Sequence, residues 1–182
     1  MKSLLAVTAA AAFASAAALS QQAPVLPEPC LHVQTPVHLS VHAPYDIAGP
    51  MFGPLGESLW LQGHWQPIFI YPQPAADVQG MVFSVLYDHQ PESWVNTLYD
   101  LKGRHIQYVY FVPDVMVAVV DVRFKHINSH RTDVTIEFTR TALNPQANPK
   151  VRAAGQADES AAEFFQQQID SYLERTRTPK QP

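Results

Sequence analysis

The chain has 182 residues, with 12 Lys and Arg against 16 Asp and Glu, and its formal net charge is −4. Because the basic residues are few and do not cluster, the composition excludes a protein that binds nucleic acid through a basic surface. The single cysteine, Cys30, excludes an internal disulfide and is interpreted as an idle thiol. Charged residues make up 15% of the chain, against about 25% in an average domain. This balance indicates a large apolar interior.

Residues 1–20 have the pattern of a secretory signal peptide. Lys2 supplies a positive charge, an apolar run follows, and small residues precede Gln21. We expect cleavage before Gln21, with cleavage after Ala16 and a retained membrane anchor as the alternatives. The run is rich in alanine, whereas a bilayer span needs about 20 strongly apolar residues. The mature protein is therefore expected to be exported, periplasmic or extracellular, without stable membrane insertion.

The mature chain is expected to hold one domain, over residues 31–176. Residues 21–30 form a Pro-rich lead-in, and residues 177–182 are expected to be a disordered tail. Apolar and polar residues alternate over residues 31–42, which predicts a half-buried strand. Pro36 within it indicates an edge position or a bulge. Glycine and proline then break residues 44–58 into one or two short helical turns.

An aromatic segment follows, with the sequence ESLWLQGHWQPIFIYP over residues 57–72. Glycine and proline interrupt it too often for a clean helix, and its ring content is too high for a solvated loop. We expect these side chains to line or plug the mouth of an apolar pocket. The residues expected to do so are Trp60, His64, Trp65, Phe69 and Tyr71.

Five strands separated by short turns are predicted after residue 77. Short turns make neighbouring strands antiparallel. The strands are predicted by runs of valine, threonine and aromatic residues. They cover residues 80–87, 93–100, 104–112, 115–126 and 131–143.

Several rings on these strands have two interpretations. Tyr108 and Tyr110 share one strand face, and Trp94 shares a face with Leu98. Phe138 is expected to be buried on the last strand. Such rings fill a core by default, but they also line a cavity in a ligand-binding fold.

A long helix is predicted near the C-terminus. Ser160 and Glu163 form a Ser-x-x-Glu capping box, so the helix is expected to begin there and to end near Thr176. Its apolar stripe consists of Ala161, Phe165, Ile169, Tyr172 and Leu173. One helix cannot fully cover a strongly curved sheet of about six long strands. The space between them is either filled by large side chains or left as a cavity.

This order of elements resembles the helix-grip fold of the SRPBCC superfamily, which includes START lipid-transfer domains, Bet v 1-like proteins and polyketide cyclases. Three stretches are similar to polyketide-cyclase-like bacterial members: GPLGESLWLQGHWQPIFIYP, SWVNTLYD followed by HIQYVYFVPDV, and TDVTIEFTRTALNP. The resemblance covers roughly residues 37–173. It implies an α+β fold in which a curved antiparallel sheet of about six strands wraps a long C-terminal helix, with short helices after the first strand.

Eight histidines raise the question of a metal site. His38 and His42 lie four residues apart on a strand, so about 13 Å separates them, too far for one ion with bonds of about 2 Å. His126 and His130 flank a hairpin tip, but no third ligand joins them. We therefore expect no metal. No Gly-x-Ser-x-Gly elbow occurs, so a hydrolase nucleophile of that kind is not expected. No Gly-rich phosphate loop occurs either, and no cofactor is expected.

Three polar residues have alternative interpretations. Glu57 either holds a carboxylate near the pocket mouth or braces the loop by accepting backbone hydrogen bonds. His64 either protonates a ligand or is an ordinary loop histidine. Arg140 shares a strand face with Phe138. If it points inward, its guanidinium would pair with a ligand carboxylate or phosphate, whereas a bulge would turn it outward.

The leading functional hypothesis is a non-catalytic carrier or sensor, a monomer or weak dimer, that binds an apolar lipid, isoprenoid or aromatic compound. A cyclase or dehydratase that uses His64, Glu57 or a tyrosine as general acid or base is the second hypothesis. A structural domain with a filled interior is the third. The residues expected to bind the ligand are Trp60, His64, Trp65, Phe69, Tyr71, Trp94, Tyr108, Tyr110, Phe138 and Arg140.

Overall fold

The computed structural model describes residues 28–87 and 90–177 of the chain. The expected signal peptide and residues 178–182 of the expected tail lie outside the described residues. In the described part, seven antiparallel strands form one sheet in the order β1-β7-β6-β5-β4-β3-β2. Their bounds are β1 His32–Val41, β2 Ile68–Tyr71, β3 Val82–Tyr87, β4 Gln90–Asp100, β5 His105–Val112, β6 Met116–Asn128 and β7 Arg131–Ala142.

The helices lie in two groups along the chain. Between β1 and β2 come α1 (Tyr45–Ala48), the 3-10 turn η1 (Gly49–Phe52) and α2 (Pro54–Trp60). After β7 come the 3-10 turn η2 (Pro145–Ala147) and the long helix α3 (Asn148–Arg177). This confirms the predicted α+β helix-grip architecture. No helix in the described ranges has both the length and the apolar character needed to cross a membrane.

The aromatic segment contributes a seventh strand, where about six were expected. Ile68 and Phe69 pair with Ser84 and Phe83 of β3, and the register shifts before Tyr71. The run Ile-Phe-Ile-Tyr has high β propensity, and β3 offers it an edge. The other edge strand of the sheet is β1, as Pro36 predicted.

A β-bulge in β4 overturns one prediction about the strand faces. Asn96 pairs with Tyr108, but Leu98 pairs with Gln107, so one extra residue lies between them. An extra residue moves every following side chain to the opposite face. Leu98 therefore does not share a face with Trp94. The buried Asn96 stabilises the bulge because its Nδ2 donates to the carbonyl oxygens of Leu98 and Gln107, at 2.9 and 3.0 Å.

Helix α3 begins twelve residues before the predicted capping box. Ser160 lies inside the helix, where its hydroxyl donates to the carbonyl oxygen of Ala157. The helical stretch instead starts at Asn144, whose side-chain oxygen accepts from the backbone N–H of Ala147 at 3.0 Å. Pro145 follows at the first position of η2, which leads directly into α3.

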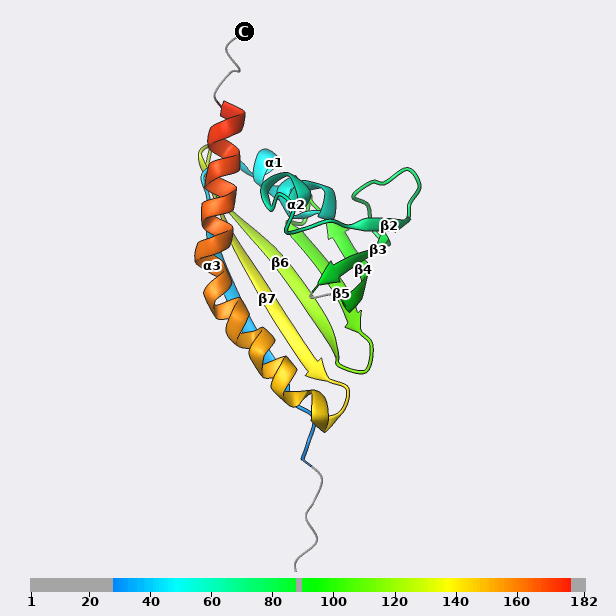
Figure 1. The fold of residues 1–182 in the computed structure, drawn as a ribbon. Helices are drawn as coiled ribbons and strands as arrows, with labels where there is room; N and C mark the ends of the chain where they lie inside the picture. Colours follow the sequence, from blue (N-terminus) through cyan, green and yellow to red (C-terminus); the bar gives the residue numbers. More distant parts are fainter. Residues whose placement is uncertain (1–27, 88–89, 178–182) are drawn as a thin grey trace, which may run out of the picture.

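Helix α3 lies along the β1 edge of the sheet, and α1 and α2 lie at one end of the molecule (Figure 1). Gln166 joins the helix to this edge. Its Oε1 accepts from the backbone N–H of Ser40, and its Nε2 donates to the carbonyl oxygen of the same residue, both at 2.9 Å. The amide side chain thus takes the place of a neighbouring strand and protects the exposed edge.

Candidate functional site

The face of α3 that turns toward the sheet is buried at both ends but not in the middle. Val151 and Ile169 are fully buried, and Leu173 is 4% exposed. Ala162 and Phe165, between them on the same stripe, are only half-buried. The complete stripe, at helical spacing, is Val151, Gly155, Asp158, Ala162, Phe165, Ile169 and Leu173. The helix therefore contacts the rest of the protein less closely at its middle.

Phe138 of β7 is a partly buried residue on the face of the sheet that turns toward α3. Its neighbours on the same face, Ile136 and Arg140, are 5% and 6% exposed, yet Phe138 is half-buried. Its cross-strand partners, Thr35 on β1 and Val120 on β6, are buried as well. Because β7 is an interior strand of the sheet, the uncovered part of this ring faces the space between the sheet and α3.

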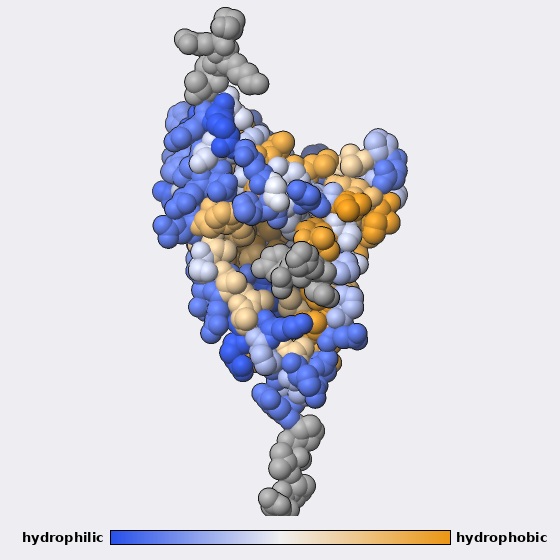
Figure 2. Space-filling view, viewed as in Figure 1, coloured by the Kyte–Doolittle hydropathy of each residue, from blue (hydrophilic) through white to orange (hydrophobic). Residues whose placement is uncertain are grey.

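Arg140 and Asp158 show how the two features align. The two residues form an ion pair, and α3 runs antiparallel to β7. One helical turn beyond Asp158 lies Ala162, and the next inward residue beyond Arg140 is Phe138. The inner side of α3 is apolar along this stretch, and the surface is hollowed beside it (Figure 2). We call this hollowed region the inner hollow, and we infer from their partial burial that Phe138, Ala162 and Phe165 border it.

A cluster of rings fills the interior on the β2 to β5 side. Trp94 stacks on Tyr110 with ring centroids 4.3 Å apart and on Phe83 at 5.8 Å. Trp65 meets Trp94 edge-on at 5.4 Å and is half-buried. Tyr108 closes the cluster through its contacts with Phe83 and Trp94. These rings contact one another, as core residues do.

The expected residues of the aromatic segment occupy three different places. Trp60 is 1% exposed, donates from Nε1 to the carbonyl oxygen of Met51 at 2.7 Å, and meets Phe165 edge-on. Phe69 is buried against Phe83. Tyr71 is 58% exposed on the edge strand β2. His64 is exposed, with its ring 5.6 Å from that of Phe164. The structure therefore does not gather these residues at one pocket mouth.

Arg140 points inward, which is one of the two orientations considered. No register shift interrupts the pairing of Phe138 and Arg140 with β6. The guanidinium binds Asp158 in a bidentate pair and donates from Nε to the hydroxyl of Tyr110 at 2.9 Å. It also lies 4.6 Å from the centroid of the Phe138 ring. Its charge is thus already matched within the protein.

Sequence reasoning missed Asp158 because the helix was predicted to begin two residues after it. The signal was nevertheless present: Asp158 lies on the spacing of Val151, Gly155, Ala162 and Phe165. A carboxylate on the inward stripe of a helix requires a cation on the facing element. Arg140 was the inward cation already under consideration.

Burial shifts the pKa values at this end of the interior. Desolvation raises the pKa of Tyr110 to about 12, although the charge of Arg140 opposes the shift. Desolvation also raises the pKa of Glu92, whose Oε2 accepts from Trp94 Nε1 at 3.0 Å. For Arg140, desolvation lowers the pKa, but Tyr110 and Asp158 outweigh it and the net direction is upward. The guanidinium therefore stays charged.

A second group of polar residues consists of Glu57 on α2 and of Asp77, Tyr99 and Tyr108 near it. Burial raises the pKa of Glu57 well above its usual range, and the charge of Asp77 adds to the effect. Among the described residues, nothing forms a hydrogen bond with the Glu57 carboxyl. Asp77 instead accepts from the backbone N–H of Leu55 at 3.1 Å. The bracing interpretation considered for Glu57 is therefore fulfilled by Asp77. Burial also raises the pKa values of Tyr99 and Tyr108 nearby.

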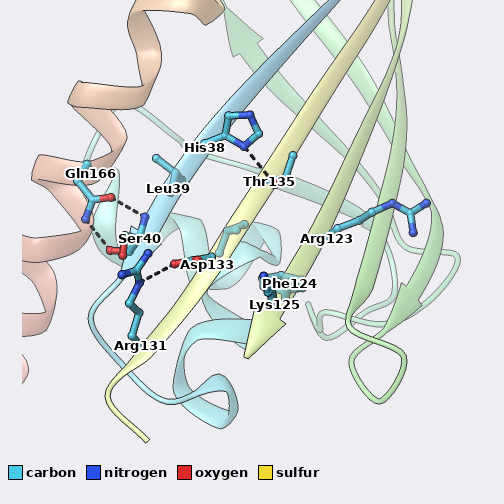
Figure 3. Close-up of a pocket in the computed structure, with 11 residues that line it drawn as sticks. His38, Leu39, Ser40, Arg123, Phe124, Lys125, Arg131, Asp133, Thr135 and Gln166 are labelled. Carbon is cyan, nitrogen blue, oxygen red and sulfur yellow. Dashed lines mark hydrogen bonds and ion pairs between the residues drawn. The ribbon is translucent and has the colours of Figure 1, made fainter. Parts of the chain in front are cut away.

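A separate groove of about 520 Å³ lies on the opposite, outer face of the sheet (Figure 3). Strands β1, β6 and β7 provide most of its lining, and α3 contributes Gln166. We call it the outer groove. The residues that line it are His38, Leu39, Ser40, Arg123, Phe124, Lys125, Arg131, Asp133, Val134, Thr135 and Gln166. Nothing in the sequence pattern singled out these residues as a group.

Within residues 28–87 and 90–177, no three His, Cys, Asp or Glu side chains come together as metal ligands. His126 and His130 are exposed at the β6–β7 hairpin, and Cys30 is exposed.

Solved structures with the same architecture come from plants and bacteria. Norcoclaurine synthase from Thalictrum flavum, in complex with dopamine and hydroxybenzaldehyde, has a TM-score of 0.60 at 11% identity and covers 84% of this chain and 91% of its own. The Zhui aromatase/cyclase from Streptomyces sp. R1128 has a TM-score of 0.55 at 16% identity, with 84% and 100% covered. Ara h 8.0201 has a TM-score of 0.53 at 10% identity, with 79% and 99% covered.

No protein-family model matches the sequence, and no curated protein is significantly similar to it. At identities of 10–16%, these similarities show a shared fold and do not show a shared function. The chain shares the helix-grip fold of these structures.

Proposed function

We propose that the protein binds a neutral, apolar small molecule in the inner hollow, without catalysis. The observation that supports this most directly is the half-buried Phe138, which lies among buried neighbours beneath the less tightly packed middle of α3. A ligand that covered this ring, Ala162 and Phe165 would gain about 25 cal/mol for each Å² of apolar surface removed from water.

The buried ion pair favours a neutral ligand. Arg140 is the cation closest to Phe138, and Asp158 neutralises it with a bidentate pair. A ligand carboxylate would have to displace Asp158 and leave that carboxylate buried without a partner, which costs several kcal/mol. Lipids, isoprenoids and aromatic compounds without a buried charge meet the requirement.

Filling the hollow tests this proposal. Ala162→Phe places a ring in the space beside Phe138, and Ala153→Phe places the same ring on the exposed side of α3. An apolar fluorescent probe titrated into the wild type should bind saturably and should bind at least about tenfold more weakly to Ala162→Phe. Ala153→Phe should bind it as the wild type does. No saturable binding by any of the three proteins would mean that the interior is filled, which is the structural-domain hypothesis. Equal saturable binding by all three would mean that the probe binds outside the inner hollow.

A catalytic role is the second candidate, and Glu57 is the specific observation for it. A carboxyl with a raised pKa and no described hydrogen-bond partner is a suitable general acid or base. The aldehyde and amine named with norcoclaurine synthase, hydroxybenzaldehyde and dopamine, are a reasonable first substrate pair. Because an amine and an aldehyde also condense without protein, mass spectrometry should detect more condensation product with the wild type than in a protein-free control, and no excess with Glu57→Gln. A wild-type yield equal to that of the protein-free control would leave binding as the function.

Export remains part of the proposal. The charge and apolar pattern of residues 1–20 supports it. Intact mass of the protein recovered from the periplasm or medium should correspond to a chain that begins at Gln21, or at Ala17 for the alternative cleavage. Full-length protein in the cytoplasm would contradict export.

A further inference from the structure

We propose that the outer groove is a second binding site, for a tetrahedral oxyanion such as a phosphate or sulfate ester. It is independent of the inner hollow because it lies on the other face of the sheet. None of the residues that line the outer groove borders the inner hollow, and its polar residues His38, Asp133 and Thr135 lie on the strand face opposite to that of Phe138. A ligand in one site therefore does not contact the other.

The outer groove is positively charged in a negatively charged protein. Arg123, Lys125 and Arg131 line it together with one carboxylate, that of Asp133. With His counted as neutral, this lining carries a net charge of +2, and Asp121, which pairs with Arg123 beside the groove, reduces the local charge to +1, whereas the whole chain carries −4. A local concentration of cations in a concave site attracts anions and repels cations.

Both arginines of the groove are held in the same way. Arg123 donates from Nε to Asp121 at 2.8 Å, and Arg131 donates from Nε to Asp133 at 2.7 Å. In each case the aspartate is two residues away on the same strand, and therefore on the same face. Because the aspartate occupies Nε, the terminal nitrogens of each guanidinium are left for a ligand. Holding the side chain beforehand also reduces the entropy lost on binding.

Asp121 is itself fixed by further contacts. His105 and Gln107 lie 2.7 and 3.0 Å from its Oδ2. Burial alone would raise the pKa of Asp121, but these hydrogen bonds and the charge of Arg123 outweigh it, so the pKa is lowered. The carboxylate that orients Arg123 is therefore charged and rigidly placed.

Lys125 and two hydroxyl groups complete the site. Within the described chain no carboxylate pairs with Lys125, since its cross-strand neighbour Asp133 is engaged by Arg131. Ser40 and Thr135 bring hydroxyls to the lining, and His38 Nδ1 lies 3.2 Å from Thr135 Oγ1 (Figure 3). Guanidinium, ammonium and hydroxyl donors together are the usual ligands of phosphate groups. The groove volume of about 520 Å³ leaves room for the organic part of an ester.

Two sources share this chemistry, a soluble phosphate ester and an anionic lipid headgroup, and two probes distinguish them. Inorganic phosphate titrated into isotopically labelled protein should shift the backbone amide resonances of Ser40, Lys125 and Thr135 saturably, and added salt should weaken the effect. Vesicles of phosphatidylcholine, with and without phosphatidylglycerol, test the lipid source by co-sedimentation. Saturable phosphate binding without co-sedimentation supports the oxyanion site and a soluble ester as its ligand. Co-sedimentation that requires phosphatidylglycerol supports the site and a lipid headgroup as its ligand.

A charge-matched pair of variants tests the location. Arg123→Gln combined with Lys125→Gln should weaken binding by about tenfold or more. Lys150→Gln combined with Arg152→Gln removes the same charge from exposed positions near the start of α3 and should leave binding within about twofold. Thermal unfolding checks that both double variants are folded. Equal weakening in both, or no saturable response to either probe, would overturn the proposal.

Discussion

Replacing one partner of the buried ion pair Arg140–Asp158 should destabilise the protein far more than replacing both partners. In Asp158→Asn the Arg140 guanidinium loses its counter-charge while it stays buried, with only 7% of its side chain exposed. Removal of one partner of a buried pair costs about 3–5 kcal/mol. At roughly 2–4 °C per kcal/mol for a domain of this size, the melting temperature should fall by about 10 °C.

Replacing both residues removes the uncompensated charge. Arg140→Met combined with Asp158→Leu fills a similar volume with apolar side chains, so it should unfold at higher urea concentration than either single variant. The loss that remains should be about 1 kcal/mol, for the hydrogen bond from Arg140 to Tyr110. Urea unfolding followed by tryptophan fluorescence and circular dichroism measures the wild type, Asp158→Asn, the two single variants Arg140→Met and Asp158→Leu, and the double variant.

An exposed pair is the control for this cycle. Arg131 and Asp133 have side chains 49% and 33% exposed, and Arg131→Gln should cost at most about 1 kcal/mol. If Asp158→Asn costs no more than Arg131→Gln, then the Arg140 pair is solvated. The argument for a neutral ligand would fail with it, because Arg140 would then be available to a ligand carboxylate.

Three further predictions concern Glu57, Gly56 and Gly155. The raised pKa of Glu57 means that the folded state holds a proton that the unfolded state releases, so the free energy of unfolding of the wild type should fall by about 1.4 kcal/mol for each pH unit as pH rises from about 4.5 toward that raised pKa. Glu57→Gln should lack this loss, whereas Glu137→Gln on the outer face should retain it. Parallel pH profiles for all three proteins would contradict the expectation. Gly56→Ala should destabilise by about 2 kcal/mol or more, since its Cβ would overlap the carbonyl oxygen of Pro50. Gly155→Ala should be neutral or stabilise by up to about 1 kcal/mol, because its Cβ would meet Thr35 Oγ1 at an ordinary contact distance of 3.4 Å and because alanine favours the helix. Chemical denaturation measures the effect of both glycine variants. A loss of stability at Gly155 as large as that at Gly56 would refute the packing argument.

The strands and the fold were predictable because each depends on local periodicity. The alternation along β1, β5, β6 and β7 is a property of neighbouring residues, and burial alternates along these strands in the same way. The predictions for the face of Leu98 and for the start of α3 were wrong because both features depend on contacts with residues far away in the sequence. The bulge in β4 depends on how Asn96 bonds the backbone of β5. The early start of α3 follows from the Asn144 cap and from the burial of Val151, Gly155 and Asp158 against the sheet.

The sequence by itself determined the architecture, through the order of its periodic elements, and the inward orientation of Phe138, through alternation along one strand. It left two orientations open for Arg140, and the unbroken register of β7 with β6 decided between them. Only the tertiary structure decided what that cation meets. Asp158 and Arg140 are 18 residues apart and on different kinds of element, so no periodicity relates them. No periodicity relates the residues of the outer groove either. Its cations come from β6 and β7 and its hydroxyls from β1 and β7, and the groove exists only because the register of β1, β7 and β6 places these side chains next to one another.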